Sequence, residues 1–152
     1  DHAAIPKWDS ASLSKLIGKD LDEEYEWREA NRVPFMAHVP GGVKLPYVKG
    51  RALGQIDIPA SAASLLGVEF ASGLGRNIFA PEPQSSPVIF RSGDYASGGT
   101  LVEPAKRAAV DLADGCERDY LPFAGLSSEC ARELALSDKI LEYGLRFPSG
   151  AK

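Results

Sequence analysis

The stretch from Gly54 to Gly67 constrains the fold most, because it holds a helix start and a helix stop within fourteen residues. Asp57 can accept hydrogen bonds from the amides of a first helical turn, and Pro59 follows where a missing N–H costs nothing. Gly67 supplies the stop, since glycine readily adopts the left-handed conformation that ends helices. The segment therefore predicts a helix that begins at Asp57 and ends before Gly67.

The same segment indicates what the helix packs against. Ala62, Leu65 and Leu66 lie three and four residues apart and so share one face of a helix. An apolar helix face must be covered, and we expect a neighbouring sheet to cover it. This arrangement is typical of an α/β domain.

Composition limits the class of protein. With 152 residues, 44% of them hydrophobic and 25% charged, the chain can form one folded domain with a real core. A net charge of -4, with no run of basic residues, disfavours nucleic-acid binding. No apolar run approaches the roughly 20 residues that a membrane-spanning helix needs, so no transmembrane segment is predicted. The opening at Asp1, without an initiator methionine, suggests a fragment of a longer protein.

The run from Arg32 to Gly42 is nearly all apolar and ends in Pro-Gly-Gly. This pattern predicts a strand over Pro34 to Val39, buried on both faces of a mostly parallel sheet. Within it, His38 is a metal ligand or proton shuttle on one interpretation. A hydrogen-bonded structural histidine is the interpretation that a buried strand favours.

Two helices are predicted before this strand. The first is capped by Asp9 or Ser10, ends at Gly18, and turns three apolar side chains inward: Leu13, Leu16 and Ile17. The second covers the acidic stretch from 20 to 30, where carboxylates surround two aromatic side chains, Tyr25 and Trp27. Carboxylates with aromatics suit a sugar or cation site, but a solvated helix face explains them more simply.

The second half of the chain predicts a small antiparallel sheet and a last helix. Strands are expected from Pro87 to a turn at Gly93, over 100–103, and over 108–112 before an Asp114-Gly115 turn. The last helix is capped by Ser127 or Ser128 and ends at Gly144, with an apolar stripe of Cys130, Leu134 and Leu141.

Three segments, in order, resemble one enzyme family. They are Gly54-Gln55-Ile56-Asp57-Ile58-Pro59 with Leu65-Leu66-Gly67, then Pro87-Val88-Ile89-Phe90-Arg91-Ser92-Gly93, then Leu136 to Leu141 with Leu145-Arg146-Phe147. Together they are similar to the lipoteichoic acid synthase-type sulfatases, or phosphoglycerol transferases, of the alkaline phosphatase superfamily. The turn from Gly73 to Phe79 also resembles that family, although Asn77 stands where an Asp is more usual.

The resemblance implies the C-terminal portion of an alkaline phosphatase-like α/β domain. Its mostly parallel sheet, flanked by helices, would include residues 1–80. A small antiparallel β subdomain with a C-terminal helix would occupy residues 81–152 of the same catalytic domain. Residues 1–152 would then pack against the rest of that catalytic domain.

The resemblance also places a metal site at the start of the chain. Asp1 and His2 match an adjacent Asp and His that are the family's last metal ligands, and carboxylate and imidazole suit divalent ions. Mn²⁺ is the expected ion, with Mg²⁺ and Zn²⁺ as alternatives. The nucleophile is expected upstream of residue 1, so no catalytic residue is assigned within this chain, and the chain alone should be inactive.

The implied reaction moves phosphoglycerol from the phosphatidylglycerol headgroup to a polyglycerolphosphate or glycolipid acceptor. It would take place on the extracellular face of a bacterial cell membrane, where a region outside this chain anchors the enzyme. Two alternatives stay open. One is a sulfatase or phosphodiesterase of the same superfamily, and the other is a noncatalytic domain that kept the fold.

Two further expectations concern single side chains. Arg91 either meets an anionic substrate or braces its turn through backbone carbonyls. An extracellular location would allow Cys116 and Cys130 to form a disulfide, the alternative being two separately buried thiols.

Overall fold

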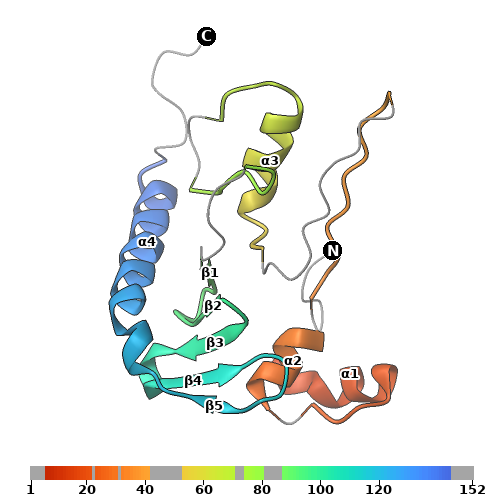
Figure 1. The fold of residues 1–152 in the computed structure, drawn as a ribbon, viewed down its shortest axis with the longest axis vertical. Helices are drawn as coiled ribbons and strands as arrows, with labels where there is room; N and C mark the ends of the chain where they lie inside the picture. The colour runs from red at the N-terminus through yellow and green to blue at the C-terminus, as the bar shows by residue number, and fades with distance from the viewer. Residues whose placement is uncertain are drawn as a thin grey trace.

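The structure is a computed structural model that describes residues 6–21, 23–30, 32–41, 53–70, 74–80 and 87–144. Four α-helices and five strands lie in these ranges (Figure 1). The helices are α1 (Ser10–Ile17), α2 (Glu24–Ala30), α3 (Asp57–Leu65) and α4 (Ala124–Glu142). The strands are β1 (Val88–Ile89), β2 (Tyr95–Ser97), β3 (Thr100–Glu103), β4 (Ala108–Asp111) and β5 (Glu117–Arg118).

The five strands form one antiparallel sheet in which each strand pairs with the next along the chain. The small antiparallel sheet predicted from the sequence is therefore confirmed, and β2 and β5 are additions to it. Gly98 and Gly99 both have positive φ, 56° and 81°, between β2 and β3. Two such residues make the tight hairpin turn whose twist suits antiparallel strands.

One row of the sheet makes the main core with α4. Tyr95, Val102 and Ala109 are cross-strand neighbours in the register, so their side chains lie on the same face. All three are buried, and Cys130 of α4 packs against them. Figure 1 shows α4 running along one side of the sheet. The predicted last helix is thus confirmed, but it begins at Ala124, before the two serines that were expected to cap it.

Helix α3 occupies the bounds that the sequence predicts, and Gly67 follows it with φ of 68°. Its buried face is different from the predicted one. Ala60 and Ser61 are buried, whereas Ala62 and Leu66 are exposed. Hydrogen bonds explain which side of α3 is buried. The Ser61 hydroxyl donates to the Asp57 carbonyl oxygen at 2.6 Å and accepts from the Ile78 amide at 3.1 Å. The side of the helix that carries Ser61 therefore faces residues 76–78.

The predicted strand over Pro34 to Val39 is wrong for this structure. Residues 32–39 form neither helix nor strand, and the side chain of His38 is exposed instead of buried and hydrogen-bonded. A strand needs a neighbour to complete its backbone hydrogen bonds. None of the described residues supplies one here. The sheet in the described residues is antiparallel throughout, so the mostly parallel sheet expected in residues 1–80 is not seen in them.

Helix α1 keeps its predicted bounds but only part of its predicted core face. Gly18 ends it with φ of 69°, and Leu13 is buried. Leu16 and Ile17, which were expected to face inward, are exposed. The Ser12 hydroxyl donates to the Asp9 carboxylate at 2.7 Å at the start of the helix. Asp9 therefore binds a side chain there and not a backbone amide.

Candidate functional site

The predicted metal ligands, Asp1 and His2, lie outside the described residues. Among the residues that the structure describes, no three His, Cys, Asp or Glu side chains gather closely enough to hold a metal ion. The candidate site that the structure can show is therefore a different one. It surrounds the turn after β1, which belongs to the segment from Pro87 to Gly93 that was singled out from the sequence.

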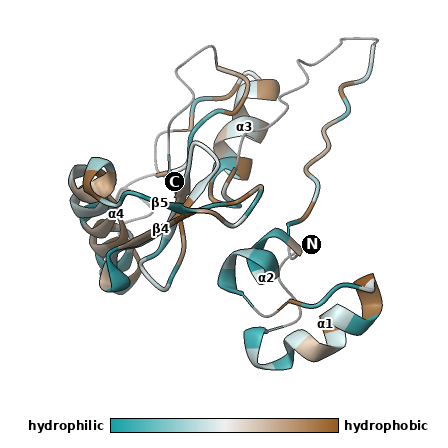
Figure 2. Cartoon of the chain, turned by 60° about the horizontal axis from the view of Figure 1, so that its bottom comes forward, coloured by the Kyte–Doolittle hydropathy of each residue, from teal (hydrophilic) through white to brown (hydrophobic). Residues whose placement is uncertain are grey.

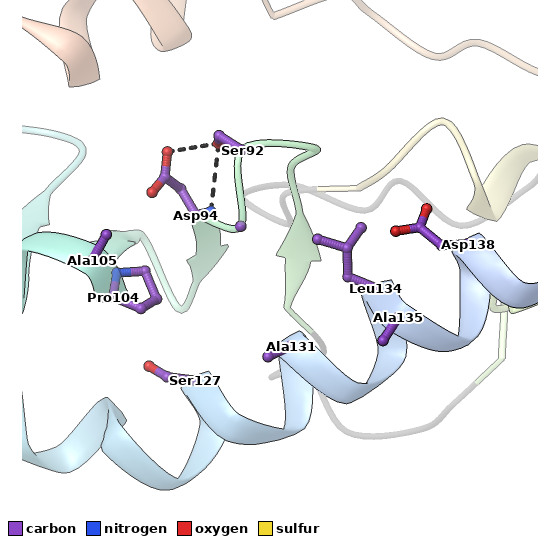
Figure 3. A pocket seen from close by; sticks show the side chains of 10 residues that line it. Ser92, Asp94, Pro104, Ala105, Ser127, Ala131, Leu134, Ala135 and Asp138 are labelled. Carbon is purple, nitrogen blue, oxygen red and sulfur yellow. Dashed lines mark hydrogen bonds between the residues drawn. The ribbon is translucent and has the colours of Figure 1, made fainter.

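A groove of about 380 Å³ lies between this turn and α4. Figure 3 shows Ser92 and Asp94 on the turn, hydrogen-bonded to each other, with Pro104 and Ala105 nearby and α4 on the other side of the groove. The floor on α4 is mostly apolar, and Ser127 and Asp138 of that helix add polar atoms. The full lining is Ser92, Gly93, Asp94, Pro104, Ala105, Ser127, Ala131, Leu134, Ala135 and Asp138.

The polar side chains of the groove already have partners. Asp94 accepts from the Ser92 hydroxyl at 2.7 Å and from Arg28 Nη2 at 2.9 Å. Asp138 accepts from Arg91 Nη1 at 2.6 Å. Ser127 donates to the Phe123 carbonyl oxygen at 2.9 Å. Both hydroxyls of the groove therefore have a partner within the described structure, Ser92 on a carboxylate and Ser127 on a main-chain carbonyl.

Arg28 joins α2 to the groove and was not singled out from the sequence. Only 14% of its side chain is exposed, and its guanidinium stacks 4.1 Å from the centre of the Phe90 ring. Nη2 bonds Asp94, while Nε lies 2.9 Å from Glu24 Oε1 without the alignment of a hydrogen bond. The predicted solvated helix face is seen only in part, because the residues of α2 are half-buried and Arg28 lies between two carboxylates and an aromatic ring.

The electrostatics of this cluster favour the charged form of Glu24. Burial alone would raise the pKa of Glu24, but the hydrogen bond from Lys7 and the positive charges of Arg28 and Lys7 outweigh it and lower that pKa below its ordinary value. Glu24 therefore remains ionised beside Arg28. The half-buried Arg28, paired with Glu24 and Asp94, joins the helix to the turn, and removing one partner would leave a charge without its compensation.

Arg91 pairs with a helix and not with its own turn. Its ion pair with Asp138 connects the tip of the β1–β2 turn to α4, and both side chains are largely exposed, at 70% and 50%. Exposed pairs of this kind contribute little to stability. The predicted bracing through backbone carbonyls is not what the structure shows, and the predicted contact with an anionic substrate stays a prediction.

Comparisons with known proteins assign the relationship that the motifs suggested. No protein-family model matches the chain. The chain is 30% identical over 162 residues to lipoteichoic acid synthase 2 of Bacillus subtilis, an alignment that covers 100% of this chain and 24% of that protein. It is 29% identical over 149 residues to the lipoteichoic acid synthase-like protein YvgJ of the same organism, covering 93% of this chain and 23% of YvgJ. The chain is a relative of the lipoteichoic acid synthases. It spans about a quarter of the length of these curated relatives.

The lipoteichoic acid synthase-like segment from Gly54 to Gly67 has a second polar cluster. Asp57 does not cap its own first turn as predicted: its carboxylate accepts from the Gly54 amide at 3.0 Å and from the Arg76 amide at 2.9 Å. Asn77, which departs from the family's usual Asp, donates from Nδ2 to the Ser64 hydroxyl at 2.8 Å and accepts from the Phe79 amide at 3.0 Å. The contacts of Asp57 and Asn77 therefore hold the loop 74–79 against α3.

The cysteines of this lipoteichoic acid synthase relative are both free. Cys116 is exposed in the turn after β4 and Cys130 is buried in the core, so the disulfide alternative is wrong for this structure, and of the two buried thiols in the other alternative only Cys130 is buried. Burial and the nearby Glu133 and Glu129 carboxylates raise the pKa of Cys130 to about 11, which keeps it an inert thiol. No helix among the described residues is both long and apolar enough to cross a membrane.

Proposed function

We propose that this chain is the C-terminal part of the catalytic domain of a metal-dependent phosphoglycerol transferase. The enzyme would move phosphoglycerol from phosphatidylglycerol to a lipoteichoic acid-type polymer or a glycolipid. The observation that supports this most directly is the similarity to lipoteichoic acid synthase 2 along the whole chain. The order of the three matched segments adds to it.

The metal site of this proposal consists in part of Asp1 and His2. Their carboxylate oxygen and imidazole nitrogen are donors that fit a divalent ion of the Mn²⁺, Mg²⁺ or Zn²⁺ type, with Mn²⁺ expected. Such an ion, when bound, neutralises charge on phosphoryl oxygens and activates a nucleophile. Two protein ligands do not complete a coordination sphere, so the other ligands and the threonine nucleophile would come from the polypeptide before residue 1.

The described residues have a supporting role in the proposal. Ser92, Asp94 and Arg28 are paired with one another beside the groove, and Arg28 connects the β1–β2 turn to α2. This arrangement suits a rigid subdomain and leaves the chemistry to residues elsewhere. The enzyme would act on the outer face of a bacterial cell membrane and would be anchored there by a region outside this chain.

The test uses the complete protein that contains this segment. In the substitutions Asp1→Asn and His2→Ala we expect phosphoglycerol transfer to fall by about a thousandfold or more, because loss of the ion removes its charge stabilisation from the transition state. Turnover of a labelled phosphatidylglycerol and bound metal by elemental analysis are measured together. Asp20→Asn, at an exposed position, is the matched control that should keep both.

Wild-type turnover in either ligand variant would contradict the proposal. Loss of turnover with full metal content would also contradict the assignment of Asp1 and His2 as ligands. Circular dichroism of each variant checks that the fold is retained, because metal ligands at an active site are expected to matter for the reaction more than for the fold.

A further inference from the structure

An extended arm, residues 32–40, projects from α2 and is covered by no other described element. Both views show it running away from the helices and the sheet (Figures 1 and 2). Figure 2 shows apolar stretches along it. Val33 and Phe35 are 42% and 41% exposed and Met36 is 84% exposed. An apolar segment of this kind, held away from the core, usually marks an interaction surface.

The backbone of the arm also has no hydrogen-bonding partner in another described segment. Arg32 donates from its amide to the Glu29 carbonyl oxygen at 3.2 Å at the end of α2. Beyond it, no backbone hydrogen bond joins residues 33–40 to any other described segment. A partner that covers the apolar side chains must therefore also satisfy exposed N–H and C=O groups, because burying them unpaired is costly.

This requirement decides the chemistry of the partner. Lipid hydrocarbon would accept the apolar side chains but offers no hydrogen bonds to an extended backbone. The main chain of another protein segment offers both, in the manner of a strand that joins a sheet edge. The chain also covers only 23% to 24% of its curated relatives, so most of a protein of that length lies outside the structure.

A second apolar surface faces outward at α3. Ile56 and Ile58 at its start are 51% and 40% exposed, and Leu66 at its end is 79% exposed. The buried side of this helix is already occupied by Ser61 and its hydrogen bonds. The outward side therefore needs a partner of its own, as the arm does, which favours a large partner over a short peptide.

We propose that the arm of residues 32–40, together with the outward face of α3, is the surface on which the rest of the same polypeptide docks. Backbone hydrogen bonds along the arm and burial of Val33, Phe35 and Met36 would hold it. The inference rests on the proposed function only in so far as that function places this chain within a longer enzyme.

The test is thiol labelling of the complete protein, in a Cys116→Ser background that removes the exposed native thiol. We expect Met36→Cys to react with a maleimide at least about tenfold more slowly in the native protein than in denaturant. Lys106→Cys is the control, since Lys106 is exposed in the short turn between β3 and β4, and it should react within about twofold of its denatured rate.

Hydrogen–deuterium exchange of the unmodified complete protein provides the second readout, in case the Met36→Cys protein fails to fold. Slow exchange of the amides of residues 33 and 35–39 supports the proposal. Exchange at the rate of a free chain, or labelling of Met36→Cys as fast as Lys106→Cys, overturns it. Protection that appears only with added phosphatidylglycerol vesicles, or that grows with protein concentration, also overturns it, in favour of a membrane or a second copy. Neither readout requires turnover, so failure here leaves the metal-ligand test of the proposed function standing.

Discussion

At the scale of single residues, Gly75 shows how tightly the loop 74–77 is fitted to the start of α3. A Cβ atom built at Gly75 would lie 1.8 Å from the carbonyl oxygen of Ile56 and 2.7 Å from its carbonyl carbon. Both are backbone atoms, so no side-chain rotation relieves the overlap. The Asp57 carboxylate, bonded to the Arg76 amide, holds the loop in this close approach.

We therefore expect Gly75→Ala to lower the free energy of unfolding by about 1–3 kcal/mol. Gly125→Ala is the matched control, because a Cβ at Gly125 meets nothing within 4 Å and alanine favours the helix by about 0.5–1 kcal/mol. Urea titration of the complete catalytic domain, followed by circular dichroism, measures both. Equal stability of the two variants would mean that loop and helix do not approach as closely as described.

The carboxylate of Glu24 makes a prediction about pH. Its pKa is lowered in the folded protein, because the contacts with Lys7 and Arg28 outweigh the effect of burial. A lowered folded-state pKa gives stability that is fully present above the unfolded-state pKa and is lost as the pH falls through the folded value. We expect stability to decrease as the pH drops below about 4.5, the ordinary value for Glu.

Glu24→Gln should reduce this acid dependence, while Glu142→Gln, at an exposed position, should leave it unchanged. The measurement is the midpoint of urea unfolding at a series of pH values between 3 and 7. An acid dependence that is the same in the Glu24→Gln protein and the wild type would show that the Lys7–Glu24–Arg28 contacts are not maintained in solution.

At the scale of elements, the contact between β2 and α4 rests on one buried hydroxyl. Tyr95 is fully buried, and its hydroxyl lies 3.0 Å from both the Phe123 carbonyl oxygen and the Ser127 hydroxyl. Ser127 keeps a bond to the same carbonyl and a bond from Tyr120 when the Tyr95 hydroxyl is removed. No buried polar group then lacks a hydrogen bond, so the loss of stability should be that of one ordinary hydrogen bond.

We expect Tyr95→Phe to lower the free energy of unfolding by about 1 kcal/mol. Tyr143→Phe removes the same hydroxyl at an exposed position after α4 and should change the stability by less than about 0.5 kcal/mol. The change in stability is measured from the denaturant midpoints of each variant and the wild type, provided that the unfolding free energy depends on denaturant concentration with the same slope in all of them. A loss well above this range for Tyr95→Phe would indicate that Ser127 does not retain its other partners.

The elements that the sequence predicted well are those whose signals are local. Predicted helices are each followed by a glycine with positive φ, namely Gly18, Gly67 and Gly144. A glycine that ends a helix can be recognised from the local sequence, without knowledge of tertiary contacts. Strands β1, β3 and β4 were likewise located, two of them by the turns at Gly93 and at Asp114-Gly115, whereas β2 and β5 were not predicted. The groove was missed because Arg28 and Asp94 are 66 residues apart in the chain, and nothing in local patterning connects a cation on an acidic helix to a turn that far away.

The predictions that failed are those that depended on a partner surface. Spacing correctly placed Leu13 in a core, but it also placed Leu16, Ile17 and Leu66 inward, and all three are exposed. Periodicity shows which residues share a helix face and not whether a second element covers it. The buried strand over 34–39 failed for the same reason, because its apolar composition calls for neighbours that the described residues do not contain.

At the scale of the whole molecule, the described core is concentrated in one place. The cluster of Tyr95, Val102, Ala109 and Cys130 joins the sheet to α4, whereas α1 and α3 bury only small areas. Large apolar side chains are exposed on the other elements, among them Trp8 at 87%, Leu16 at 76% and Met36 at 84%. Surface of this kind stabilises a protein only when something covers it, and it promotes association when nothing does.

These features predict how residues 1–152 behave when produced alone. We expect marginal stability and self-association, because the arm of residues 32–40 offers unpaired backbone and apolar side chains to any neighbouring chain. Analytical ultracentrifugation should show species larger than the monomer, and thermal unfolding followed by circular dichroism should be broad. The complete protein, in which the arm and α3 are covered, should unfold more sharply. A monomeric chain with a single sharp two-state transition would mean that residues 1–152 are complete in themselves, and it would remove the physical reason for a partner at the arm.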